Sequence, residues 1–397
     1  MVKIFNSYEE ARDGFNRFME PQDFHDMKKA NGVDVYAWQA REYLLEEESQ
    51  AVGTNLSCYV LRIGEKTAKR KVMISSGVHG LEGFIGSSIQ QEIIEHHLAK
   101  FTREDTALIF VHAVNPYGFY HRIRNNENNV DLNRNVRDHR QPCAPTDLFE
   151  EVHAALKYDE AGENFEDFKK RYQKIKKEYI AQHGYEPWKR TLIAGQYKYQ
   201  DGMLYGGAAE QEQITMLRDI VSDFCATAED MVFIDLHSGL SGGYGDVAPL
   251  LNATMNKSDF DRACDWWGEE MKIFADSYTG DQNLDGEVAN VFDRNNYTTF
   301  TSITLEACVG DLDVAIDHLV ELNWMYQADK AGAEGAYTNQ EMTDLKAALL
   351  SRYSPPDQEW YDTVFNNVMP YIEEPFKRWA QADLKAQQKP AFKKLEP

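Results

Sequence analysis

Four short apolar segments stand out along the chain, and each has the length and composition of a β-strand. Their residues are mostly Val, Ile, Leu, Phe and Met, without the strict alternation of a half-exposed strand. Runs of this kind are typical of strands that are covered on both faces of a sheet. The predicted strands occupy residues 71–75, 107–111, 231–236 and 301–305.

Apolar residues at helical spacing follow the first of these strands. They are Phe84, Ile85, Ile89, Ile93, Ile94 and Leu98, and they predict a helix over 84–98. A strand, a helix and a second strand in this order indicate an α/β fold, in which helices flank a mostly parallel or mixed central sheet.

Two regions differ from this pattern because Lys, Glu, Tyr and other helix-compatible residues dominate them. Residues 142–199 predict a helical insertion, which either covers a cleft or forms a solvated pair of helices. Residues from about 319 to 397 predict a helical tail. Without internal repeats or a Gly/Ser linker, residues 1–397 are expected to form a single domain with insertions.

Composition excludes several classes of partner. The 397 residues include 42 Lys and Arg against 65 Asp and Glu, a net charge of −23. This balance argues against nucleic acid and against anionic membranes. The chain also has no apolar run near the roughly 18 residues of a membrane helix, and its first residues turn acidic where a signal peptide would be apolar. Five scattered cysteines without a CxxC pair suit a reducing compartment, so we expect a cytoplasmic protein.

Polar side chains follow or interrupt the predicted strands at the edge where open α/β sheets bind ligands. After the first strand, His79 and Glu82 are flanked by glycines and can offer a nitrogen and an oxygen to one metal ion. His237 leaves the third strand into a glycine-rich loop and can supply a third ligand. Glu306 directly follows the fourth apolar run and has apolar neighbours, where a carboxylate needs either a salt bridge or a function.

The segment after the second strand is dense in amide and guanidinium groups. It extends over residues 115–135 and includes Arg122 and Arg124. A turn-rich loop explains part of this composition, but the density favours recognition of an anion or a carboxylate. Two histidines and one glutamate with an open fourth position describe a catalytic zinc site, and a further glutamate beside it can act as the base.

Five motifs together resemble the zinc carboxypeptidase family, the funnelin-type metallopeptidases, and in particular its bacterial DUF2817-type branch. They occur in the family's order between about residues 70 and 310. The motifs are His79-Gly80-Leu81-Glu82-Gly83, Asn115-Pro116-Tyr117-Gly118, Asp131-Leu132-Asn133-Arg134-Asn135, Asp235-Leu236-His237-Ser238-Gly239 and Leu305-Glu306-Ala307-Cys308. The resemblance implies a zinc-carboxypeptidase-like α/β sandwich.

The resemblance also implies roles for individual residues. His79, Glu82 and His237 match the ligands of one zinc ion. Glu306 matches the general base and acid that activates the water molecule.

Three further roles concern the substrate and its surroundings. Arg124 best matches the arginine that polarises the scissile carbonyl, with Arg122 as the other candidate. Asn133 and Arg134 match the pair that holds the substrate's terminal carboxylate. Asp131 resembles the aspartate that orients the first ligand histidine.

The likeness leaves two positions open. Family members carry a mobile tyrosine over the site, and Tyr205, Tyr244 and Tyr297 are all candidates. The residue at the base of the specificity pocket should lie between the second histidine ligand and the catalytic glutamate, but no motif marks its position.

The expected activity is zinc-dependent hydrolysis of an amide bond next to a free carboxylate, as in a carboxypeptidase. One alternative keeps the zinc site but removes the acyl group from N-acyl amino acids. Another is a degenerate member that binds a ligand without catalysis. The expected partner is a peptide or acyl-amino-acid substrate with a free carboxylate, and the sequence does not indicate an oligomeric state.

Overall fold

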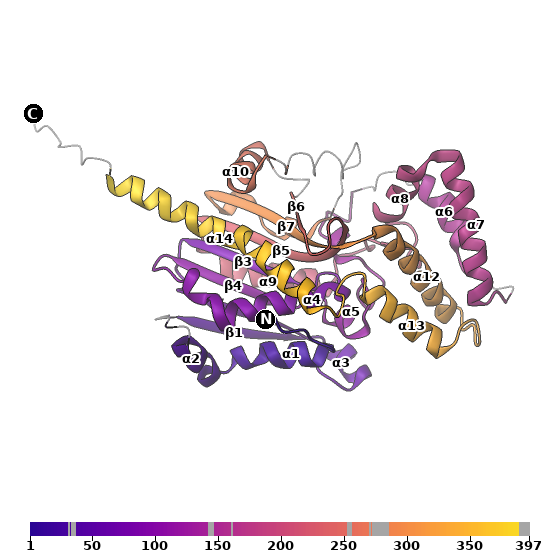
Figure 1. Ribbon diagram of the computed structural model, residues 1–397, viewed down its shortest axis with the longest axis horizontal. Helices are drawn as coiled ribbons and strands as arrows, with labels where there is room; N and C mark the ends of the chain where they lie inside the picture. The colour runs from indigo at the N-terminus through magenta and orange to yellow at the C-terminus, as the bar shows by residue number, and fades with distance from the viewer. Residues whose placement is uncertain are drawn as a thin grey trace, which may run out of the picture.

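In the part of the chain that the structure describes, a mixed β-sheet of seven strands forms the centre, as the computed structural model in Figure 1 shows. The structure describes residues 1–30, 32, 37–141, 147–159, 162–251, 256–269, 271 and 286–388. The strands lie in the order β1-β2-β4-β3-β5-β7-β6. Their bounds are β1 Trp38–Leu44, β2 Ser57–Ile63, β3 Arg70–Ser76, β4 Thr106–His112, β5 Asp230–Ser241, β6 Val247–Leu250 and β7 Thr299–Gly310.

The four strands predicted from the sequence are β3, β4, β5 and β7, and they are neighbours in the sheet that run parallel to one another. The antiparallel strands β1 and β2 extend the sheet on one side, and β6 is the antiparallel edge strand on the other. The prediction of a mostly parallel, mixed sheet flanked by helices is confirmed.

The parallel strands bury side chains on both faces. In β3, Val72 and Ile74 belong to one hydrophobic cluster, whereas Met73 between them belongs to a second cluster on the opposite face. In β5, Ile234 and Phe233 divide in the same way. Continuous apolar runs arise because neither face of these strands is left to solvent.

Helices cover both faces of the sheet. Residues of α1, α2, α4, α10 and α14 contribute to the first cluster, and α9 covers the second. The predicted helix over 84–98 is α4, which continues through a π-helical turn and a final 3-10 turn. The bounds are α1 Tyr8–Asn16, α2 Pro21–Ala30, α3 Glu46–Val52, α4 Gly83–Glu92, α5 Pro116–His121, α9 Glu212–Cys225, α10 Lys257–Trp267 and α14 Gln358–Gln388.

The predicted insertion and tail are both helical, and the insertion packs against the first two helices of the tail at one end of the sheet (Figure 1). The ring of Trp324 in the tail stacks on Phe168 of the insertion at a centroid distance of 4.9 Å. The insertion is therefore packed on the tail and is not a solvated pair of helices. Its helices are α6 Asp147–Leu156, α7 Phe165–His183 and α8 Tyr185–Ile193, and the tail also contains α12 Leu312–Lys330 and α13 Asn339–Leu350.

Parts of both predicted ranges, residues 142–146, 160–161 and 389–397, lie outside the described residues. Within the described residues, none of the helices has both the length and the apolar composition needed to cross a membrane. The described residues also form short helical turns. They are η1 Arg17–Met19, η2 Gly80–Glu82, η3 Ile93–His97, η4 Leu98–Lys100, η5 Leu132–Arg134, η6 Val288–Val291 and η7 Arg294–Asn296.

Candidate metal centre and active site

The first two candidate ligands lie on a tight turn between β3 and α4. His79 precedes η2, and Glu82 is the last residue of that turn. Gly80 packs directly on α5, where a Cβ atom would lie 1.9 Å from the carbonyl carbon of Gly118. Since a residue with a side chain does not fit there, the glycine allows the turn to approach α5 and fixes the position of both ligands.

His237 lies inside β5 and not in a loop. The sequence predicts that this histidine leaves the strand, but β5 continues to Ser241 and keeps pairing with β7. In the parallel register His237 is the partner of Glu306. The strand persists through the glycines because β7 offers backbone partners, with register irregularities only beyond Ser238.

The structure brings the three predicted metal ligands together. Nδ1 of His79 lies 2.9 Å from Oε1 of Glu82, and Nδ1 of His237 lies 2.8 Å from Oε2 of the same carboxylate. The two Nδ1 atoms are 3.2 Å apart. All three side chains are buried, and one ligand atom from each lies within 4.8 Å of the others.

Two aspartates hold the far nitrogens of the imidazole rings. Nε2 of His79 lies 3.2 Å from Asp131, as the resemblance implies. Nε2 of His237 lies 2.6 Å from Asp235, whose other oxygen accepts a hydrogen bond from Ser75 at 2.6 Å. With Nε2–H donated to a carboxylate, each ring directs the lone pair of Nδ1 toward the same point.

This donor set fits a zinc ion. Tetrahedral zinc at 2.0–2.1 Å from two imidazole nitrogens separates them by about 3.3 Å, close to the distance of 3.2 Å between the two Nδ1 atoms. Without a cation, two lone pairs and a carboxylate would face one another in a buried site, which is unfavourable. Two nitrogens and one carboxylate are also a ligand set of catalytic zinc sites.

Neighbouring charges shift the pKa values of Glu82 and His237. Burial raises the pKa of Glu82, but the neighbouring His79 and His237 outweigh this effect and hold that pKa below its usual range. Burial lowers the pKa of His237, and the carboxylates of Asp235 and Glu82 outweigh it, so the pKa lies well above its ordinary value. The cluster therefore favours ionised carboxylates around a positive charge.

The pKa of Glu306 shifts in the opposite direction from that of Glu82. Burial raises its pKa to about 8; the charge of His237 opposes this shift and that of Glu82 adds to it. Because Glu306 lies beside His237 on the neighbouring strand, it faces the metal centre without being one of the three converging ligands. A carboxyl group whose pKa lies near neutrality is suited to proton transfer.

A cavity of about 120 Å³ is lined by two of the three ligands, His79 and Glu82. Its lining includes the candidate catalytic and substrate-binding residues Glu306, Arg124, Asn133 and Arg134. The insertion contributes Ile193, so it forms part of the wall of the site.

Of the two candidate arginines, Arg124 lines the cavity. Its Nε donates to Asp131 at 3.0 Å, so this aspartate joins Arg124 to His79. Arg122 instead donates to the backbone carbonyl of Asn6 at 3.0 Å.

Asn133 and Arg134 are both held by the surrounding backbone. Oδ1 of Asn133 accepts from the amide of Val288 at 2.9 Å. The guanidinium of Arg134 donates to the carbonyls of Ala194 at 3.0 Å, Asn133 at 2.9 Å and Ile193 at 3.1 Å. Among the described residues these bonds use three of the five N–H groups of an arginine, which leaves two for a ligand.

The tyrosine at the cavity is Tyr353, and it is none of the three candidates named from the sequence. Tyr244 is exposed and donates to Asp357 at 2.8 Å. Tyr297 packs against the rings of Phe292 and Phe300.

Tyr205 is buried, and its carbonyl accepts from the amide of Asp131 at 2.8 Å. Tyr353 follows α13 and is also buried. Burial raises the pKa of the Tyr353 phenol, an effect that the nearby charge of Arg124 opposes. No motif marks Tyr353, because it lies in the tail beyond the last of the five segments that carry the resemblance.

One protein family matches the chain over most of its length. It is described as "Protein of unknown function (DUF2817)", and the match extends over residues 6–367. A comparison with curated proteins finds no match.

Solved structures with a similar chain include carboxypeptidase A from Helicoverpa armigera, which is 16% identical, with 84% of this chain and 74% of that one covered and a TM-score of 0.42. Murein-tripeptide amidase from Escherichia coli O157 is 12% identical, with 76% and 95% covered and a TM-score of 0.33. Succinylglutamate desuccinylase from Chromobacterium violaceum is 13% identical, with 84% and 74% covered and a TM-score of 0.31. By its match to the family over residues 6–367, the chain belongs to the DUF2817 family.

Proposed function

We propose that the protein is a zinc-dependent hydrolase that cleaves an amide bond next to a free carboxylate. One observation carries this proposal: Nδ1 of His79, Nδ1 of His237 and the Glu82 carboxylate converge on one point, while Glu306 stands beside His237 on the next strand. A metal-binding group with a separate carboxyl group next to it is the minimum that metal-assisted hydrolysis requires.

A zinc ion held by His79, Glu82 and His237 supplies Lewis-acid activation of water at neutral pH. Glu306 accepts a proton from the attacking water as its oxygen adds to the amide carbon. When the carbon–nitrogen bond breaks, Glu306 returns this proton to the leaving amine, so the carboxylate is regenerated.

The other residues of the cavity stabilise and orient the substrate. Arg124 presents its guanidinium to the oxygen of the scissile carbonyl as negative charge develops there. The two remaining N–H groups of Arg134, together with the amide of Asn133, hold the terminal carboxylate. Asp131 keeps Arg124 and His79 in a fixed relation, because it bonds to both.

A second candidate function is removal of the acyl group from N-acyl amino acids. The cavity at the metal ligands is small, about 120 Å³, and Ile193 of the insertion forms part of its wall. This enclosure favours short substrates on the carboxylate side. A ligand-binding member without catalysis is the third candidate, and the placement of Glu306 and Arg124 on the cavity argues against it.

The deciding experiment measures metal content and hydrolysis on the full chain. We expect about one zinc ion per chain, and hydrolysis of short peptides or acyl amino acids that stops with a chelator and returns with zinc. C-terminally amidated versions of the same substrates should react much more slowly. Relative rates on peptides and acyl amino acids separate the two enzymatic candidates. A protein that binds no metal, or whose hydrolysis survives chelation, would overturn the proposal.

A further inference from the structure

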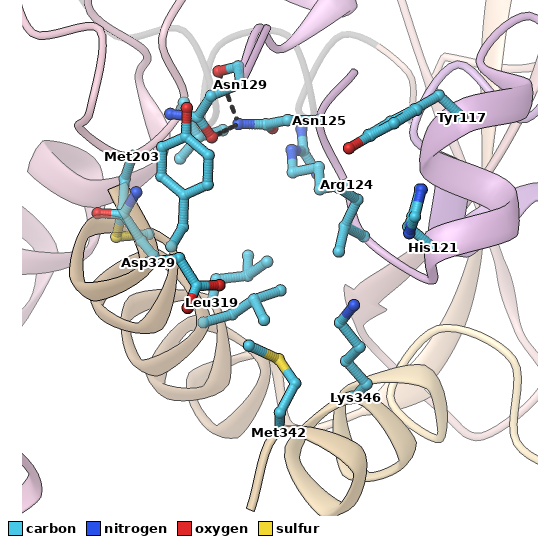
Figure 2. A pocket seen from close by; sticks show the side chains of 15 residues that line it. Tyr117, His121, Arg124, Asn125, Asn129, Met203, Leu319, Asp329, Met342 and Lys346 are labelled. Carbon is cyan, nitrogen blue, oxygen red and sulfur yellow. Dashed lines mark hydrogen bonds between the residues drawn. The ribbon is translucent and has the colours of Figure 1, made fainter. Parts of the chain in front are cut away.

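A second, larger cavity adjoins the candidate active site. It has a volume of about 210 Å³, and it shares Arg124, Leu204 and Leu319 with the cavity at the metal ligands. The two cavities are therefore neighbours, with Arg124 between them. Figure 2 shows Arg124 among the side chains that line the second cavity, together with Tyr117 and His121 of α5 and residues of the tail helices.

If the proposed function holds, the two cavities bind opposite sides of the scissile bond. Arg134 and Asn133 line only the first cavity and would hold the carboxylate on the amine side of the scissile bond. Arg124, at the scissile carbonyl, is shared with the second cavity. The second cavity is then the place for the acyl side of the substrate.

One wall of the second cavity carries basic groups. Lys346 of α13 points its amine toward His121, as Figure 2 shows. No hydrogen bond or ion pair of the Lys346 amine is found among the described residues. Burial lowers the pKa of Lys346; the charge of Asp329 opposes this shift and that of Arg122 adds to it. Burial and the charge of Lys346 also lower the pKa of His121. Lys346 and His121 are thus two basic side chains on the same wall of the cavity.

The remaining lining is mostly apolar, with one acid. Leu319, Leu322, Met203, Met342 and the ring of Tyr326 form it together with amide groups. Asp329 is the carboxylate among the described lining residues; it is exposed and accepts a hydrogen bond from Tyr337. The cavity thus combines an apolar stem region with a half-buried amine whose charge lacks a close partner.

We propose that the second cavity is a binding subsite for an acyl group that carries an anionic end, such as the half-amide of a dicarboxylic acid or an acidic side chain. This inference rests on the proposed function and names its substrate class. An apolar stem of a few carbons would lie against Leu319, Leu322 and Met342, and the carboxylate would pair with Lys346. The partner anion would offset the cost of burying the ammonium, which the chain itself offsets only in part, through the charge of Asp329.

The test uses N-succinyl-, N-glutaryl- and N-adipoyl-L-alanine, each compared with the same compound whose distal carboxylate is a primary amide. For the best chain length, we expect kcat/KM to be at least tenfold higher for the acid than for its amide. Lys346→Gln should remove this preference by raising KM for the acid much more than KM for the amide. Lys346→Arg should restore most of the preference. Lys177→Gln, which removes an exposed charge from α7, is the matched control.

A binding measurement separates this proposal from the proposed function. Calorimetric titration of the acid and its amide needs no turnover, so it remains informative if none of the compounds is hydrolysed. Tighter binding of the acid to the wild-type protein, weakened at least tenfold by Lys346→Gln, supports the subsite. Equal affinity for acid and amide, or a preference that survives in Lys346→Gln, overturns it even where hydrolysis is observed.

Discussion

His237 of β5 and Glu306 of β7 are register partners in adjacent parallel strands. Partners in a parallel pair present their side chains on the same face of the sheet. The sheet therefore places one candidate ligand and the candidate base side by side. A separation set by strand pairing is more rigid than one set by loops.

The first prediction concerns Glu306. Glu306→Gln keeps the shape of the side chain but cannot accept the proton, so kcat should fall by about 10²–10⁴-fold. Zinc content should remain unchanged, because Glu306 is not among the three converging ligands. Elemental analysis and steady-state kinetics on the same preparation measure both. Glu359→Gln, an exposed position on α14, is the control for the chemical change. Near-normal turnover in Glu306→Gln would exclude this residue as the base.

The second prediction concerns Asp235. Asp235→Asn removes the negative charge that holds Nε2 of His237 at 2.6 Å, and we expect zinc affinity to fall about 10–100-fold. Competition with a chelating dye measures this change. Asp230→Asn, at the opposite end of β5, should leave the affinity unchanged. If both variants bind zinc as the wild type does, Asp235 does not orient the ligand.

The contact between Asp235 and His237 could not be predicted from the sequence. Asp235 and His237 are two residues apart, and side chains at this spacing share a face only if the segment is a strand. Because glycines follow His237, local composition predicts a loop at this point and hides the alternation. Pairing with β7 extends the strand, which is a tertiary effect that local composition does not contain.

The parallel strands are predictable because burial on both faces leaves a continuous apolar signature. Strand β1 escapes prediction because it lies at the sheet edge and its sequence, from Trp38 to Leu44, mixes charged and apolar residues. Tyr353 escapes it because only the packing of the tail on β5 brings this residue to the cavity. In contrast, the ligand motifs are recognisable, since each keeps its spacing within one short segment.

The third prediction tests the position of Tyr353. Gly239 has φ of +104°, and a Cβ atom there would lie 2.4 Å from Cε1 of the Tyr353 ring. Gly239→Ala should therefore displace the ring and lower kcat/KM, in addition to destabilising the fold. Gly310 also has φ of +104°, but among the described residues nothing lies within 4 Å of the position that an alanine methyl group would occupy there. Gly310→Ala thus reports backbone strain alone, about 1–3 kcal/mol.

Chemical denaturation and kinetics on both glycine variants separate the two effects. We expect Gly239→Ala to lose more stability than Gly310→Ala and to lose activity as well. Equal losses of stability with equal activity would mean that the contact with Tyr353 has no consequence for the site.

The fourth prediction concerns Arg134, which bonds to the end of α8 and which we propose also binds the substrate carboxylate. Arg134→Met removes the bonds to Ile193 and Ala194, so amide hydrogen exchange over residues 185–195 should accelerate. KM should rise for substrates with a free carboxylate more than for their amides. Arg190→Met, at an exposed position on α8, is the control and should change neither. Faster exchange without any difference between free and amidated substrates would leave Arg134 a structural role only.

The fifth prediction concerns the pH dependence of stability. His112, at the end of β4, is buried against the ring of Phe15, and its Nε2 lies 2.6 Å from the hydroxyl of Ser87. Burial lowers its pKa from 6.5 to about 3. The unfolded chain therefore binds a proton at this residue below pH 6.5, whereas the folded chain does so only near pH 3. Since the unfolded state then holds more protons, the free energy of unfolding falls as the pH falls through this window.

Between about pH 7.5 and 5, the contribution of His112 to this loss should be about 2 kcal/mol. His112→Phe keeps a ring in the same space and has no titratable group. It should be less stable at pH 7.5, because the Ser87 hydroxyl loses its partner, but its stability should decline less with acid than that of the wild type. His96→Gln, at a side chain that is 61% exposed, should leave the decline unchanged. Urea unfolding at pH 7.5, 6 and 5 measures the three slopes. The variant has no titratable group at position 112. If its stability declined with acid as steeply as that of the wild type, groups other than His112 would account for the acid sensitivity.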